Sequence, residues 1–306
     1  MKRYIIRRAG YSLLSLFLLS LTIFLFVRVT GDPTTLMLEP GASQQDIDNL
    51  RHQLGLDQPV WVQYWHFVES FVTANLGQSF YYRTPVFDLY LERLPNSLLL
   101  AAAAMAFSLV IGIPSGVLAA VRVGSFWDNA GKIFTLLGLS LPSFFVGLVL
   151  ILFFTVYLGW LPSSGSGTPL HLIMPAVTLG WYFAASHMRL TRSSMLEVLG
   201  SEYVKLARLK GLPEPLVIGK HAFKNALIPV ITLAGINLAL MINATVIVEM
   251  IFAWPGIGRL LYEGISFRDF PVVQAVVVLA GSMIILVNLL VDILYAVIDP
   301  RIRLES

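Results

Sequence analysis

Long runs of apolar residues, rather than apolar residues at regular short intervals, dominate this chain. A helix needs about 20 consecutive apolar residues to cross the hydrocarbon core of a bilayer. Six runs come close to or exceed that length, and we predict a transmembrane helix in each. The predicted spans are residues 9–29, 97–121, 133–158, 172–190, 227–252 and 272–298. The fourth span is the most polar because it contains Pro175, Gly180, Ser186 and His187.

The overall composition agrees with lipid as the main solvent of the chain. Hydrophobic residues make up 57% of the 306 residues and charged residues only 13%, whereas soluble domains carry about 25% charged residues. The predicted fold class is therefore an all-α membrane protein with six transmembrane helices. Cysteine is absent, which excludes disulfides, thiolate metal sites and a cysteine nucleophile.

The basic residues flank the apolar runs and predict the orientation of the chain. With the amino terminus inside, 15 of the 21 Lys and Arg residues fall in the inner segments 1–8, 122–132, 189–226 and 299–306. Lys and Arg are enriched in cytoplasmic segments, so we expect both termini in the cytoplasm. The first run is too long for a signal peptide, and no small-residue cleavage site follows it; we predict a retained helix.

The predicted spans divide the chain into four parts. Residues 1–29 form the cytoplasmic N-terminus and the first transmembrane helix, and residues 30–96 form a periplasmic segment. Residues 97–298 form a core of five helices that contains a long inner loop, residues 189–226, and residues 299–306 form a cytoplasmic tail.

The periplasmic segment has two helical patterns. Ser43 and Asp46 resemble a weak capping box, so a short helix should follow and stop at Gly55. Aromatic side chains then recur at helical spacing. They are Trp61, Tyr64, Trp65, Phe67 and Phe71. This stripe predicts either an amphipathic helix that packs on the membrane interface or on the bundle, or a surface that docks a soluble partner.

The inner loop is polar, basic and too long for a simple turn, yet its pattern is ordered. The fourth span continues as helix into the loop, and a second helix is predicted from Glu202 to Lys210, ended by Gly211 at the C-cap position. Pro213 and Pro215 predict a sharp turn before a further helix leads back to the membrane. The loop is therefore expected to be a rigid projection below the bilayer.

Polar and ionisable residues inside a span are costly and suggest functional sites. Arg28 lies near the outer end of the first span. The candidates for a translocation path or gate are Asn237, Asn243, Glu249, Asn288 and Asp292. Two interpretations stay open for them, namely hydrogen bonds between helices and the lining of a path.

Motifs for catalysis are absent from the sequence. A nucleotide-binding loop needs Gly, four residues, then Gly-Lys followed by Ser or Thr. The two Gly-Lys pairs follow Phe126 and Glu214 where that first Gly should stand, and neither precedes Ser or Thr. The five His residues are scattered. We therefore expect no ATPase site, metal site or other cofactor in this chain.

At the inner loop the sequence resembles the loop by which bacterial ABC-importer permeases engage their ATPases. The general pattern is Glu-Ala-Ala, three residues, Gly, nine residues, Ile-x-Leu-Pro; here only Ala207 matches the first triplet, Gly211 is in register and Pro229 comes about five residues late. With these departures, the loop of this chain is similar to the loop of the dipeptide, oligopeptide and nickel branch of the family. The matching residues are Glu202, Tyr203, Val204, Ala207, Arg208, Lys210, Gly211, Leu212, His221, Ala222, Asn225, Ala226, Leu227, Ile228 and Pro229.

Further short motifs of that branch extend the resemblance over essentially the whole chain. One follows the first span, a second lies in the periplasmic segment, a third follows the fifth span and a fourth closes the chain. They are Gly31-Asp32-Pro33, residues 54–59, residues 252–258 and residues 299–303.

The resemblance implies a type I ABC-importer permease fold in the bacterial inner membrane, and a heteromeric complex. Its partners would be a second homologous permease, two ATPases that bind ATP and magnesium, and a periplasmic or lipoprotein substrate-binding protein. This chain resembles the first permease of the pair. The corner at Gly211 would act as a coupling helix on an ATPase.

The substrate class is less closely defined by the resemblance. Short peptides come first, and nickel or other metal chelates, glutathione, opines and some sugars are alternatives. A self-sufficient secondary carrier is a more distant alternative, weakened by the small number of spans and by the structured inner loop.

Overall fold

The computed structural model describes residues 2–29, 43–53 and 55–298. In these residues the ordered elements are helices, with one isolated antiparallel bridge between Gln78 and Pro85. The chain divides into two compact units, residues 1–95 with 256–306 and residues 96–255. The motifs predicted at residues 31–33 and 299–303 lie outside the described residues.

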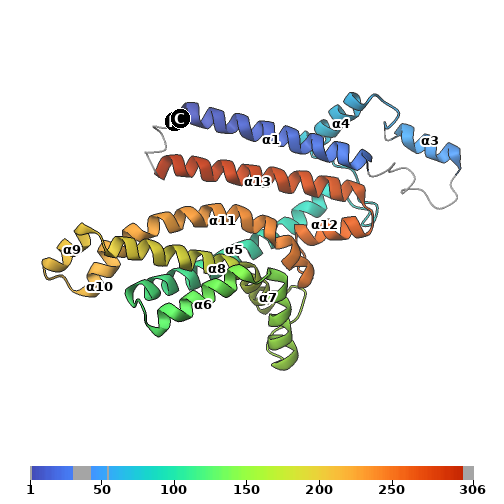
Figure 1. Ribbon diagram of the computed structural model, residues 1–306. Helices are drawn as coiled ribbons and strands as arrows, with labels where there is room; N and C mark the ends of the chain where they lie inside the picture. The colour runs from blue at the N-terminus through green and yellow to red at the C-terminus, as the bar shows by residue number, and fades with distance from the viewer. Residues whose placement is uncertain (1, 30–42, 54, 299–306) are drawn as a thin grey trace. The chain divides into compact units, whose positions relative to one another are not determined.

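The first unit is built on two long helices, α1 (Lys2–Val29) and α13 (Phe270–Ile298), which lie side by side (Figure 1). Gly281 permits the close approach, since a Cβ there would lie 2.4 Å from Leu19 Cδ2. Small residues at such crossings are typical of membrane helix pairs. The predicted short helix before Gly55 is confirmed as α3 (Gln44–Gln53), and Gly55 adopts a φ of +65°.

The aromatic stripe forms helix α4 (Val60–Val72), which packs on α1. Tyr64 lies edge-on against Phe24, with ring centroids 5.1 Å apart, and its hydroxyl lies 2.8 Å from Ser20 Oγ. Trp61 and Trp65, in contrast, are 75% and 68% exposed. The stripe therefore packs on α1 along one edge, and its tryptophans are largely exposed among the residues that the structure describes.

Helix α12 (Ile257–Ser266) and the segment before α5 (Val86–Val121) complete the first unit. Buried Ser79 donates a hydrogen bond to Asp269, 2.5 Å away, and Tyr82 donates one to Glu263. Burial, together with the Glu263 hydrogen bond, raises the pKa of Tyr82 to about 12. These contacts join residues 79–82 to residues 263–269, which are far apart in the sequence. An apolar cluster around Val86 and Leu260 holds the same two parts of the chain together.

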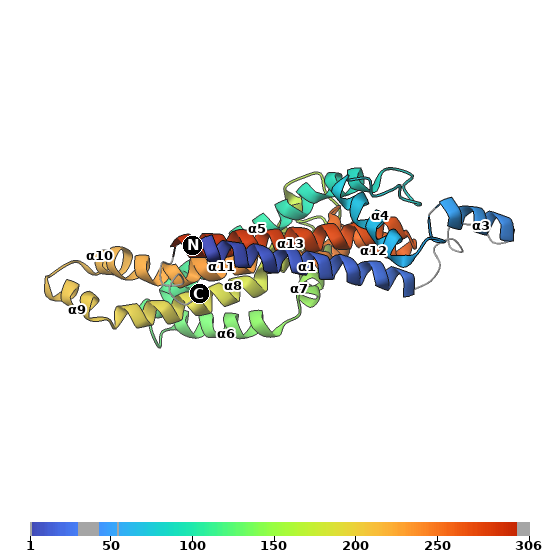
Figure 2. The same ribbon diagram turned by 90° about the horizontal axis from the view of Figure 1, so that it is seen from above.

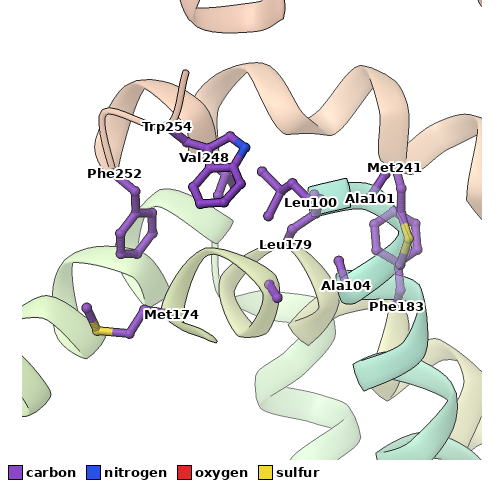
Figure 3. Close-up of a cluster of buried hydrophobic side chains, with 11 residues drawn as sticks. Leu100, Ala101, Ala104, Met174, Leu179, Phe183, Met241, Val248, Phe252 and Trp254 are labelled. Atoms are coloured by element: carbon purple, nitrogen blue, oxygen red, sulfur yellow. The ribbon is translucent and has the colours of Figure 1, made fainter. Parts of the chain in front are cut away.

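The second unit holds the later part of α5 and the helices that follow it. These are α6 (Phe126–Ser140), α7 (Ser143–Leu150), the π-helix η1 (Ile151–Tyr157), α8 (Leu170–Leu199), α9 (Glu202–Leu209), α10 (Glu214–Leu216), the π-helix η2 (Val217–Phe223) and α11 (Lys224–Ile251). Its core joins α5, α8 and the end of α11, and Figure 3 shows Leu100, Leu179, Val248 and Trp254 converging there.

Helices α5 and α8 approach closely because the residues at their crossing are glycines, which have no side chain. A Cβ on Gly112 would lie 2.7 Å from the Ala184 carbonyl oxygen, and one on Gly180 would lie equally close to that of Ala104. Any side chain at either position would have to displace backbone. The crossing therefore depends on glycine at both positions.

The third predicted span, residues 133–158, is not one continuous helix, so the prediction of a single helix there is wrong. The chain breaks at Leu141 and Pro142, and the helical segments before and after the break are bent by 110°. Proline has no backbone N–H and disfavours helical geometry in the residue before it; Leu141 accordingly adopts φ −81° and ψ 128°. Continuous hydropathy concealed this local break.

Four helices are long and apolar enough to cross a membrane, namely Ile6–Phe26, Val86–Val121, Glu214–Ile251 and Phe270–Leu289. The bent pair α6 and α7–η1 would make a fifth span if it is counted as one. The predicted fourth span lies in the continuous helix α8. Its polar residues make α8 less apolar than the four helices named above, and it is not counted among them. The chain is thus a multi-pass helical protein, and six spans remain a prediction.

Candidate functional site

The segment predicted to be a rigid projection is a compact helical hairpin at one end of the α8 and α11 pair (Figures 1 and 2). Helix α8 runs to Leu199, past its predicted span, and α9 follows after a short turn. The chain then reverses at Gly211 and returns through α10 and η2 into α11. The predicted helix before Gly211 and the further helix back to the membrane are confirmed in these elements. Pro213 lies in the turn as predicted, but Pro215 lies inside α10, because the first turn of a helix tolerates a residue without an N–H.

The corner is a Schellman motif centred on Gly211. Lys210 is the C-cap of α9, and Gly211 follows it with a φ of +74°. The Gly211 N–H bonds to the Arg208 carbonyl at 2.9 Å, and the Leu212 N–H bonds to the Ala207 carbonyl at 3.4 Å. This is the hydrogen-bond pattern of that motif. Apart from its chain neighbours, no atom of the described residues lies within 4 Å of a Cβ built at Gly211. Glycine is therefore needed there for the backbone conformation, and the surface beside it is open.

One apolar cluster holds the hairpin together from inside. Val204 and Ala207, one helical turn apart on α9, pack against Val217 of η2, and all three side chains are buried. The opposite face of α9 carries Leu206 and Leu209, which are 52% and 84% exposed. Within the described chain, the hairpin therefore presents an uncovered apolar face beside its corner.

An ion pair closes the corner from outside. Arg208 on α9 donates from Nη2 to Glu214 Oε1 at 2.7 Å and from Nε to Oε2 at 3.2 Å. The hydrogen bond to Glu214 raises the pKa of the Arg208 guanidinium above its usual value. The sequence analysis singled out Arg208 but not its partner, because a partner six residues away across a turn has no fixed spacing.

The remaining predicted loop residues occupy the same hairpin. Asn225 donates from Nδ2 to Tyr203 Oη at 3.1 Å and to the His221 carbonyl at 3.0 Å. Glu202 is exposed and paired with Lys205 at 2.8 Å. Lys210 is exposed, Leu212 packs on the internal cluster, and Pro229 lies inside α11. The structure brings all ten predicted loop residues onto this hairpin and the first turns of α11.

A buried carboxylate that the sequence analysis missed lies at the start of α6. The Asp128 side chain is fully buried and accepts hydrogen bonds from Arg192 Nε at 2.7 Å and from the Gly124 N–H at 3.0 Å. Lys132 Nζ lies 2.9 Å from its second oxygen. These contacts fasten α6 to the part of α8 that leads into the hairpin. Ser125, which caps α6 three residues before Asp128, was the available sequence signal.

Two of the five polar candidates in the spans are buried between helices. Glu249 is fully buried, and Ser97 donates to its Oε1 at 2.6 Å. Asn237 is also buried, with its Nδ2 3.2 Å from His187 Nε2. Both contacts join α11 to a neighbouring helix of the second unit.

The other three candidates differ from this pair. Asn243 is exposed on α11 and donates to the Ala239 carbonyl within its own helix. Asn288 is exposed on α13. The backbone of Asp292 continues α13, but its side chain lies outside the described residues. Residues 2–29, 43–53 and 55–298 contain no group of three or more His, Asp or Glu that could hold a metal ion.

Comparison with curated proteins gives relatives of full length. The chain is 40% identical over 304 residues to the Glutathione transport system permease protein GsiC of Escherichia coli strain K12, covering 99% of both chains. The protein of that name from Shigella dysenteriae serotype 1 matches with the same identity and coverage.

Comparison with solved structures gives relatives in fold. A chain of an amino acid ABC transporter with histidines matches with a TM-score of 0.55 at 14% identity, covering 68% of this chain and 92% of that one. A chain of the MetNI methionine ABC transporter, in an inward-facing conformation, matches with a TM-score of 0.56 at 22% identity, covering 69% and 96%.

Two family descriptions match the sequence and together cover nearly all of it. Residues 1–102 match the N-terminal region of the binding-protein-dependent transport system membrane component. Residues 112–304, which include the hairpin, match the binding-protein-dependent transport system inner membrane component. The chain therefore belongs to the family of binding-protein-dependent transport system inner membrane components, the multi-pass inner-membrane permeases of ABC importers.

Proposed function

We propose that this permease imports short peptides, with glutathione as a specific candidate. The observation that carries the proposal is 40% identity over full length to a glutathione transport permease, since glutathione is itself a tripeptide. Metal chelates and opines remain alternatives. The described residues offer no His or carboxylate cluster that would favour a metal ion.

The hairpin is proposed to be the site that couples the permease to a separate ATPase subunit. Its rigid internal cluster, its open glycine corner and its exposed Leu206 and Leu209 support this role. Leu206 and Leu209 lie one helical turn apart on α9 and so form one continuous exposed apolar surface, the kind that marks a contact site. A movement imposed on the corner would pass directly into α8 and α11, because the hairpin continues both helices.

The path itself is proposed to form against a second, homologous permease. Exposed Asn243, in the C-terminal half of α11, supports this, since a polar side chain left outside its own bundle needs another polar surface. Asn288 and Asp292 remain further candidates for the path. The burial of Glu249 and Asn237 supports the interhelical interpretation for those two.

The proposed topology has six spans and cytoplasmic termini, which the distribution of basic residues supports. Cysteines introduced one at a time into this cysteine-free chain test it in intact spheroplasts. An impermeant maleimide should label Ala74→Cys and should not label Gly219→Cys. If Gly219→Cys were labelled and Ala74→Cys were not, the chain would have the opposite orientation.

The function is tested by purifying the tagged chain from its native membrane and identifying its partners. Co-purification of a second permease, two ATPases and a binding protein is expected, followed by ATP-dependent uptake of labelled glutathione or dipeptides in liposomes. Uptake by the chain alone, without ATPase subunits, would overturn the proposal in favour of a secondary carrier.

A further inference from the structure

The first unit contains a polar pocket of about 710 Å³ at the end of α1. Its walls come from the end of α1, from α4 and the segments on both sides of it, and from the beginning of α13. Its polar lining includes Arg28, His66, Asn75 and Gln274. The function proposed above uses none of these residues.

Arg28 is the cation of this pocket and has no ion pair among the described residues. Its Nε and Nη2 donate to Gln63 Oε1 at 3.1 and 2.5 Å, and Nη1 donates to the Phe24 carbonyl at 3.2 Å. The guanidinium carbon lies 3.4 Å from the centre of the Phe24 ring. A guanidinium has five N–H donors, and contacts within residues 2–29, 43–53 and 55–298 use three of them. The group is thus held in place, and within the described residues it keeps its charge and two donors for a further acceptor.

A second, apolar groove of about 600 Å³ lies between α1, α4 and α13. Leu13, Phe17, Trp65, Phe71 and Leu279 are among its lining residues, and Ser282 is one of its few polar ones. Phe67 lines both this groove and the polar pocket. The groove and the pocket are therefore neighbours that share a side chain.

Their order along the helices matches the depth of a lipid in a bilayer. The groove is lined by residues 13–20 of α1, inside the candidate span Ile6–Phe26, whereas Arg28 lies just past its end. On α13 the groove is lined near Val278 and the pocket near Phe270. At 1.5 Å per residue, Arg28 lies about 12 to 22 Å along the axis from residues 13–20. Half of a hydrocarbon core is about 15 Å thick.

We propose that the pocket and the groove together bind one anionic phospholipid, with its phosphate on Arg28 and an acyl chain in the groove beside Trp65. Arginine binds phosphate through its planar set of donors, and an apolar groove at the depth of the hydrocarbon core fits an acyl chain. The bound lipid would fill the space between α1, α4 and α13. It would stabilise α4 on the long helices of the first unit.

Native mass spectrometry of the full-length chain in mild detergent tests the proposal. The probes are phosphatidylglycerol, phosphatidylcholine and inorganic phosphate, each added after the protein has been stripped of lipid. The wild type is expected to retain one phosphatidylglycerol at least about tenfold more tightly than phosphatidylcholine. Arg28→Gln should remove that preference, and Arg28→Lys should keep part of it because the charge remains.

The groove is tested separately by filling it. Ser282→Leu adds apolar volume there and should release both lipids. Ser115→Leu is the matched control, because both serines donate to the carbonyl four residues earlier in a long apolar helix. Equal retention of phosphatidylglycerol by Ser282→Leu and wild type would overturn the proposal. Equal retention of phosphatidylglycerol by Arg28→Gln and wild type would also overturn it. A third contrary result is that Ser282→Leu binds inorganic phosphate while the wild type binds neither lipid.

Discussion

Arg208 and Glu214 face each other across the Gly211 corner and share two hydrogen bonds, from Nη2 to Oε1 at 2.7 Å and from Nε to Oε2 at 3.2 Å. A two-point contact of this kind fixes orientation as well as distance. It fastens the end of α9 to the start of α10, on the outside of a hairpin whose inside is held by Val204, Ala207 and Val217. The pair therefore braces the segment that we propose couples the permease to its ATPase.

Charge reversal tests this brace. Arg208→Glu and Glu214→Arg each place like charges at the corner, and each should lower substrate-stimulated ATPase activity of the assembled transporter several-fold. The double variant restores the attraction and should recover most of the activity. The same swap in Asp48 and Arg51, an ion pair on α3 outside the hairpin, is the control and should have little effect. Failure of the Arg208 and Glu214 double variant to recover would instead indicate that one of them contacts the ATPase directly.

Substitutions at Gly211 separate backbone conformation from surface contact. Gly211→Ala forces an L-residue into φ +74°, at a cost of roughly 1–2 kcal/mol, and should lower uptake. Gly211→Pro cannot adopt that φ and should abolish uptake. Gly211→Asn should retain most activity because Asn tolerates positive φ.

The charge at the corner is tested by comparing Gly211→Asp with Gly211→Asn, which have nearly the same shape. We expect Gly211→Asp to insert normally and to lose uptake, because a carboxylate would enter the ATPase interface. Gly219→Ala is the conformational control, since Gly219 is in open space without a positive φ. Wild-type uptake by a normally inserted Gly211→Asp variant would refute the coupling role.

Asp128→Asn should destabilise the second unit while leaving membrane insertion intact. The substitution removes the charge that accepts hydrogen bonds from Arg192 and the Gly124 N–H, and that pairs with Lys132. Thermal unfolding of the tagged chain in detergent should occur several degrees lower. Asp88→Asn is the control, because Asp88 is also in the first turn of a helix but is exposed. Equal melting of both variants would show that the buried contacts contribute nothing measurable.

Asn237 and Asn243 should respond to the same substitution in opposite ways. Asn237→Leu removes the partner of buried His187 and should lower stability by about 1–3 kcal/mol. Asn243→Leu leaves stability unchanged, since that side chain is exposed, and should lower uptake or alter substrate preference. Thermal unfolding combined with uptake in liposomes distinguishes the two effects. Normal uptake by Asn243→Leu would remove it from the proposed path.

Much of this architecture could be predicted from local sequence. Apolar runs of sufficient length predict long helices because only internally hydrogen-bonded segments are stable in lipid. The Gly211 corner was equally predictable, since its motif depends on consecutive residues and on the positive φ that glycine permits. Pro142 carried the signal for the break in the third predicted span, but hydropathy alone does not register the missing N–H.

Contacts between segments far apart in the sequence were decided only by the tertiary structure. Asp128 lies 64 residues from Arg192, and Ser97 lies 152 residues from Glu249; no periodicity relates such pairs. The same holds for Asn237 and Asn243, which look alike in sequence. Packing buries one and exposes the other, because the orientation of a helix about its axis depends on its neighbours. The sequence by itself thus determined helices, turns and family, whereas packing between helices decided which polar residues are structural and which remain available for function.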